Sequence, residues 1–124
     1  SKWAPTFDTT EGFVNGGGGD ATISAISGTP NHLRVTKGST GTISYGVKRG
    51  IAVVPNKQSI LNVTVIGNDS TSTWQVKIKA HDGTLLGESA IDSGTSAVTY
   101  AIPFYTLDAN YVQVELHQTT NSVY

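Results

Sequence analysis

Four polar side chains alternate with apolar ones near the end of the chain, and their types are those that bind sugars. The row comprises an aromatic ring, an amide, a carboxylate and an imidazole: Tyr111, Gln113, Glu115 and His117. An aromatic face can stack on the C–H face of a pyranose, while amide and charged groups can form paired hydrogen bonds to neighbouring hydroxyls. These residues are therefore the first candidates for carbohydrate binding.

A second polar row has the same period. Gln75, Lys77 and Lys79 alternate with the apolar residues of the stretch 74–80. Because successive side chains of a β-strand point to opposite faces, each row predicts a strand with one buried and one hydrated face. Arg34, in the alternating stretch 32–36, extends the set to a third strand.

The two long rows become one surface if their strands lie in the same sheet, and a curved sheet would make that surface a cleft for an extended glycan. A sheet face that is merely hydrated has a similar composition. A structural or adhesive domain of a surface protein is therefore the alternative to a carbohydrate-binding domain. The predicted carbohydrate-binding residues are Tyr111, Gln113, Glu115, His117, Gln75, Lys77 and Arg34.

The beginning of the chain carries a different chemical signal. Asp8, Glu11 and Asp20 stand among Gly and Thr residues, next to a run of four glycines. Carboxylates are the hard oxygen ligands that calcium takes, although no EF-hand spacing is present. These three residues are the predicted metal ligands of a structural calcium site, and a solvated acidic loop is the alternative.

No compact catalytic motif accompanies these candidates. The three histidines and nine acidic residues form none of the usual hydrolase or metalloprotease patterns. Glu88 and Glu115 are the one pair that would suit a glycosidase, where two carboxyl groups flank the bond that is cleaved. We expect no enzyme. A net charge of −1 with 14% charged residues also argues against nucleic-acid binding.

The elements that must position these side chains are strands. Thr, Ser, Gly, Val and Ile are abundant, and no Gly-free window has the helical apolar period. The predicted class is all-β, an antiparallel β-sandwich of jelly-roll type. The expected strands are 3–7, 21–26, 32–36, 42–47, 49–54, 60–66, 74–80, 84–90, 97–104 and 111–117.

Local signals refine this arrangement. The polar stretch 67–72 predicts a turn that joins 60–66 and 74–80 into a hairpin at the middle of a sheet. Trp74, Tyr45, Tyr100 and Phe104 share faces with aliphatic residues and are predicted in the core. Asp82-Gly83 is a strong turn signal.

Three motifs together resemble the jelly-roll carbohydrate-binding modules, of the calcium-containing sandwich type, that are appended to bacterial xylanases and glucanases. They are the stretches 7–13, 28–35 and 73–80, in that order along the chain. The resemblance implies non-catalytic glycan binding, secretion, a covalently linked catalytic domain and a structural calcium ion near the first strand, with Asp8 at the metal-binding acid.

The sequence departs from that family pattern at two places. Phe13 stands where the family has a Gly-Trp-like pair, and no Asp follows Tyr111 to close the calcium site. Either a closing strand lies beyond residue 124 or the calcium site is incomplete.

These observations combine into one expectation. Residues 1–124 form a single domain, excised from a larger chain since methionine is absent, that binds plant or microbial polysaccharide. No apolar run is long enough to span a bilayer. We expect a secreted protein with neither nucleic-acid nor membrane partners.

Overall fold

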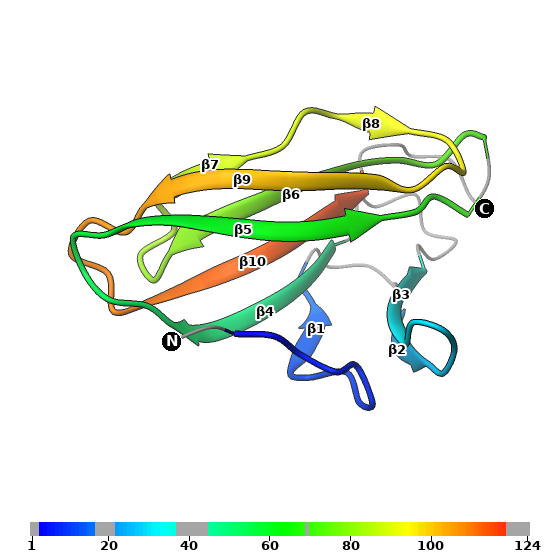
Figure 1. Cartoon of the computed structure of the whole chain (residues 1–124), viewed down its shortest axis with the longest axis horizontal. Helices are drawn as coiled ribbons and strands as arrows, with labels where there is room; N and C mark the ends of the chain where they lie inside the picture. Colours follow the sequence, from blue (N-terminus) through cyan, green and yellow to red (C-terminus); the bar gives the residue numbers. More distant parts are fainter. Residues whose placement is uncertain (1–2, 17–21, 37–44, 69, 119–124) are drawn as a thin grey trace.

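A computed structural model describes residues 3–16, 22–36, 45–68 and 70–118. These residues form ten β-strands and no helix, which confirms the all-β prediction (Figure 1). In chain order the strands are β1 (Phe13–Asn15), β2 (Thr22–Ile26), β3 (His32–Thr36), β4 (Tyr45–Ala52), β5 (Gln58–Val65), β6 (Thr73–Ala80), β7 (Leu85–Glu88), β8 (Asp92–Ser93), β9 (Val98–Tyr105) and β10 (Tyr111–Gln118).

Six strands make one large antiparallel sheet. Its order is β1-β4-β10-β6-β7, and β8 also pairs with β6. β6 and β10 occupy its centre, as their alternation requires, because apolar residues at every second position bury one face. We call the face that carries Val76, Ile78, Val112 and Val114 the inner face, and the opposite one the outer face.

A second layer of two separate antiparallel pairs covers the inner face. β5 pairs with β9, and β2 pairs with β3. The β5–β9 pair supplies Ile102, Phe104, Leu61 and Val63 to the core cluster of the large sheet. The β2–β3 pair packs at Gly46 on β4, where an added Cβ would lie 3.2 Å from Val35 and 3.3 Å from Ile23. The predicted β-sandwich is therefore confirmed as a two-layer antiparallel arrangement.

The predicted hairpin of 60–66 with 74–80 is wrong. β5 and β6 are neighbours in sequence but lie in different layers, since β5 pairs with β9 and β6 with β10, β7 and β8. The stretch between them crosses from one layer to the other. A polar turn cluster looks the same in sequence whether it closes a hairpin or carries a crossover.

Two further predicted elements differ from the structure. Residues 3–7 form no strand, and Phe7 adopts a positive φ of 56°, a conformation outside the β region. The expected strands 42–47 and 49–54 are one strand, β4, over the described residues. Gly50, at φ 74°, lies within it beside an irregular register opposite Val112 and Val114.

Hydrogen bonds donated by side chains join the two layers. Trp74 is 3% exposed, which confirms its core position, and its Nε1 donates to the Tyr100 hydroxyl at 2.8 Å. That hydroxyl donates to Asp92 Oδ2 at 2.6 Å. Burial, and then the hydrogen bond to Asp92, raises the pKa of Tyr100. At the other end, Thr106 Oγ1 donates to Val54 O at 2.7 Å.

Within the described ranges, the structure contains no helix that could cross a membrane.

Candidate functional site

The outer face of the large sheet brings the two predicted polar rows together. β10 and β6 are paired, with Gln113 opposite Lys79, Glu115 opposite Lys77, and His117 opposite Gln75. This confirms that the rows lie side by side on one surface. We call these six residues the polar face: Gln75, Lys77, Lys79, Gln113, Glu115 and His117.

Glu115 is the centre of the polar face. It is only 3% exposed. Its Oε1 lies 3.1 Å from Lys79 Nζ and 2.6 Å from His117 Nε2. A buried carboxylate needs such donors, because burying an unpaired charge is costly. Glu115 therefore organises the surrounding side chains and is already occupied by them.

His117 is held between Glu115 and an aromatic ring. Its ring stacks on Tyr45 of β4, with centroids 4.2 Å apart and planes 13° from parallel. Burial lowers the pKa of His117, and the hydrogen bond and charge of Glu115 oppose that effect only in part. The neutral ring, donating from Nε2 to Glu115, is thus the favoured form at neutral pH.

The lowered pKa gives His117 a defined effect on stability. Its ordinary pKa is 6.5, so below that value the unfolded chain takes up a proton that the folded protein resists. The free energy of unfolding should therefore fall as pH drops from about 7 to 5, and less steeply in His117→Gln. Urea unfolding at several pH values measures this. An equal slope in the parent and in His117→Gln would contradict the prediction.

Tyr45 is a residue of this surface that sequence reasoning placed elsewhere. Its alternation with apolar neighbours predicted the core, yet it lies on the outer face against His117. Val47, next on that face, is 1% exposed but does not belong to the core cluster. Tyr45 lies opposite His117 and Val47 opposite Glu115, so their place on the outer face follows only once the pairing of β4 with β10 is known.

Tyr111 lies at the other end of the β10 row. It is 39% exposed, and its ring centroid lies 5.5 Å from that of His81. Gln75 is engaged, because its Nε2 donates to Glu88 Oε2 at 3.1 Å and to Ser89 O at 2.9 Å. Lys77 and Gln113 form no side-chain hydrogen bond or ion pair with the described residues. Tyr111, Gln113 and Lys77 are therefore the groups most available to a ligand.

Arg34 does not extend this surface, and the prediction that it might is wrong. It lies on β3, opposite Ser24 of β2, in the second layer. The structure has a large hollow between the two layers, on the inner side of the large sheet.

The predicted calcium ligands are only partly described. Asp8 Oδ2 lies 3.1 Å and Glu11 Oε1 3.4 Å from the single hydroxyl of Thr6, and Asn31 Nδ2 donates to Asp8 Oδ1 at 2.9 Å. The hydroxyl has one hydrogen, so it can satisfy only one of the two carboxylates. Asp20 lies outside the described residues. Within those residues, no group of three or more His, Cys, Asp or Glu converges on one point.

Comparisons with known proteins support the fold. No family model matches the sequence, and no curated protein matches it. Among solved structures, the chain is similar to the enzymatically active domain of tailspike protein 4 from bacteriophage CBA120, with a TM-score of 0.63 and 11% identity over 93% of this chain. The chain spans only 18% of the length of that tailspike chain. At this identity the likeness concerns the fold alone.

Proposed function

We propose that this chain is a non-catalytic carbohydrate-binding domain of jelly-roll type, and that it binds polysaccharide along the polar face. The observation that carries the proposal is the pairing of β10 with β6, which joins both polar rows into one surface with a tyrosine at each end. Strands β3, β4, β5 and β6 alternate between the two layers, as do β9 and β10, and this alternation supports a jelly roll.

Each available group has a distinct role in this proposal. The exposed ring of Tyr111 stacks on a sugar, and Gln113 and Lys77 bond its hydroxyls. Tyr45, already parallel to His117, offers a second ring at the far end of the row. Glu115, Lys79 and His117 hold the surface in shape. An extended row of this kind suits a chain of sugars, and the lysines favour hydroxyl-rich or acidic ones.

Replacing Tyr111 by alanine should weaken polysaccharide binding by about 1–3 kcal/mol, by analogy with stacking on aromatic platforms, and leave folding nearly intact. Affinity electrophoresis on a panel of soluble polysaccharides measures this change. Tyr105→Ala is the matched control, since Tyr105 is 44% exposed on β9 in the other layer.

The function would be contradicted if Tyr111→Ala and Gln113→Ala both bound as the parent does. Loss of binding in Tyr105→Ala alone would move the site to the other layer. Absence of binding across the whole panel would favour a structural or adhesive domain. Turnover of the polysaccharides would show an enzyme.

We also propose a structural calcium ion at the acidic start of the chain. Asp8 Oδ2 and Glu11 Oε1 both lie near the Thr6 hydroxyl, at 3.1 and 3.4 Å, and its single hydrogen can serve only one of the two carboxylates. These residues fit part of the six to eight oxygens that calcium takes. The ion would stabilise the fold and take no part in chemistry.

Chelation should then lower the melting temperature, because an ion that binds only the folded state adds to stability as its concentration exceeds the dissociation constant. Calorimetry with and without a chelator measures this, and Asp8→Asn should abolish the difference. An unchanged melting temperature, with no metal found by elemental analysis, would contradict the site.

Secretion and attachment to a larger polysaccharide-degrading enzyme complete the proposal, in line with the modules that the sequence resembles.

A further inference from the structure

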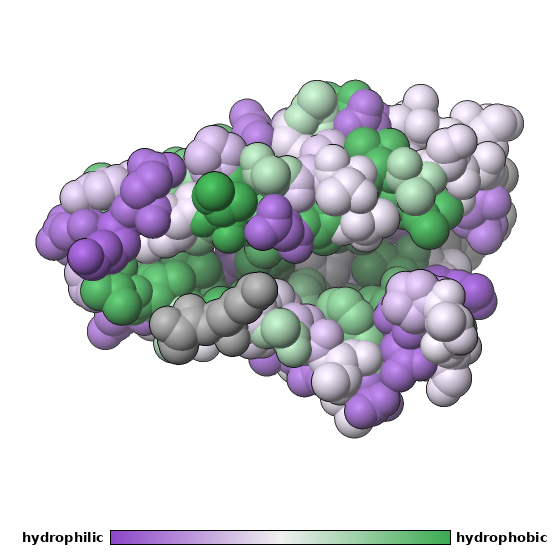
Figure 2. All heavy atoms as spheres, viewed as in Figure 1, coloured by the Kyte–Doolittle hydropathy of each residue, from purple (hydrophilic) through white to green (hydrophobic). Residues whose placement is uncertain are grey.

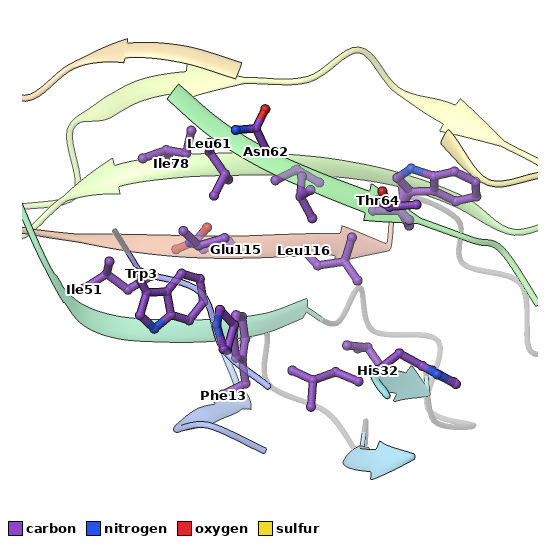
Figure 3. Close-up of a pocket in the computed structure, with 18 of the residues that line it drawn as sticks. Trp3, Phe13, His32, Ile51, Leu61, Asn62, Thr64, Ile78, Glu115 and Leu116 are labelled. Carbon is purple, nitrogen blue, oxygen red and sulfur yellow. The ribbon is translucent and has the colours of Figure 1, made fainter. Parts of the chain in front are cut away.

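The hollow between the layers is a feature of the molecule that the polar face does not explain. It is a cleft of about 1550 Å³, and Figure 2 shows it running along the molecule with apolar side chains inside. Of the inner-face residues that line it, Val76, Ile78 and Val112 are at most 2% exposed and pack against β5 and β9. The floor left open to a ligand is therefore the partly exposed Leu116 with the neighbouring Val114. Figure 3 shows Leu61 of β5 beside Ile78, and Trp3 between Ile51 and Phe13.

The two flanks of the cleft are strand edges. Every residue of β3 and every residue of β5 lines it, whereas β6 contributes mainly alternate residues. A strand that lies flat over a cavity presents every second residue, so an uninterrupted run indicates that the backbone edge faces the space. Among the described residues, β3 pairs only with β2 and β5 only with β9. Both strands therefore face the cleft with an edge that pairs with no other described strand.

A separate observation points to a missing hydrogen-bond donor. Gln118 ends β10 at the cleft, and its Nε2 donates to Val35 O of β3 at 2.9 Å. Its Oε1 is buried and accepts no hydrogen bond from the described residues. Buried acceptors are nearly always paired. An N–H group lying beside β3 would supply the donor that this oxygen lacks.

These features distinguish between possible occupants. An aliphatic ligand would cover the apolar floor but leave the backbone groups of two strand edges unpaired, at a cost for each buried group. A sugar could bond the edges but would lie on aliphatic side chains, which give it no stacking surface. An extended polypeptide satisfies both, because its backbone pairs with the edges and its alternate side chains reach the floor.

The flanks also carry charge. Arg34 on β3 and Lys57, next to β5, are exposed and line the cleft. Neither takes part in the Lys79–Glu115 ion pair or the His117–Glu115 contact. A ligand strand with carboxylates near its ends would complement these two cations. A ligand strand that paired along the whole of β5 would be eight residues long.

We propose that the cleft is a docking slot for an extended β-strand supplied by another polypeptide chain, inserted between β3 and β5. The strand has apolar residues at alternate positions and acidic residues at its ends. It joins the two pairs of the second layer into one continuous sheet. This slot is on the inner side of the large sheet, so the inference does not depend on carbohydrate binding by the polar face.

The probe is a labelled, end-blocked eight-residue peptide with alternating Val and Thr and a Glu at each end. Fluorescence anisotropy should show saturable binding to the full 124-residue chain. Amide hydrogen exchange should slow in both β3 and β5. The matched control is the same peptide with alternate backbone amides N-methylated, which keeps its apolar surface but cannot pair with a strand edge. We expect at least a tenfold weaker affinity for it.

Charge reversal tests the orienting groups without disturbing the core. The double variant Arg34→Glu, Lys57→Glu should bind the Glu-ended peptide several-fold more weakly and a Lys-ended peptide more tightly. The proposal is overturned if the chain binds neither peptide, if the N-methylated peptide binds equally well, or if a fatty acid competes where the peptide does not.

Two further results would assign the slot to a different occupant and also overturn the proposal. In one, a chain shortened to end at Gln118 binds the peptide while the full chain does not, which would place the chain's own last residues in the slot. In the other, size-exclusion chromatography shows a dimer that excludes the peptide, which would identify a second copy as the occupant.

Discussion

Replacing Ile78 by alanine should lower the free energy of unfolding by about 2–5 kcal/mol, the range for removing a large aliphatic side chain from a packed core. Ile78 is 0% exposed and belongs to the core cluster between the layers. A smaller side chain leaves a cavity at this position, because the surrounding strands relax only in part. Urea unfolding measures the change.

Ile66 is the matched control for this substitution. It carries the same side chain just beyond β5 and is 64% exposed. Ile66→Ala should stay within about 0.5 kcal/mol of the parent, as exposed substitutions usually do. Similar losses in the two variants would contradict the packing of β6 beneath the second layer.

Glu115→Gln should destabilise the protein by about 1.5–3 kcal/mol, the range for hydrogen bonds to charged groups. The substitution keeps the shape of the side chain and removes its charge. Lys79 and His117 would then face a neutral amide at 3.1 and 2.6 Å. Because the Lys79 side chain is 28% exposed and can regain water, we expect less than the cost of exposing a fully buried charge.

The control for Glu115→Gln is Glu88→Gln on the same face. Glu88 is exposed and accepts a hydrogen bond from Gln75, so its loss should cost no more than about 0.5 kcal/mol. Thermal and urea unfolding of both variants measure the difference. An equal cost for the two would show that Glu115 does not organise the polar face.

Alternation made the strands and the direction of their side chains predictable. Both β6 and β10 were expected to within a residue at each end, and their polar rows point to one face as predicted. Each strand buries one face only, so every second position records the burial. That information lies within a single strand and needs no knowledge of its neighbours.

The choice of neighbours could not be predicted in the same way. Nothing within 60–66 or 74–80 distinguishes a hairpin from a crossover, and the two strands lie in different layers. Arg34 was placed on the polar face for the same reason. Tyr45 shows a further limit. Strict alternation assigns every second residue to one face, and the irregular register between β4 and β10 interrupts that alternation.

The candidate site was therefore predictable in its centre and not at its borders. Gln113, Glu115 and Lys77 follow from local alternation, whereas the stack of Tyr45 on His117 depends on the pairing of strands far apart in sequence. The cleft was unpredictable, because it arises from the separation of β3 and β5 within a layer. No single stretch of sequence records that separation.

The central place of β10 in the large sheet has a consequence for how the protein is made. β1 and β4 lie on one side of β10, and β6, β7 and β8 lie on the other, so β10 alone joins the two halves. Residues 111–118 follow every other described strand in the sequence. The large sheet can therefore close only after its other described strands have been synthesised, and pairing β10 with β4 across so long a stretch of chain is an intrinsically slow step. Until then the strand edges of β4 and β6 stay open, and these are the surfaces through which incomplete chains would aggregate.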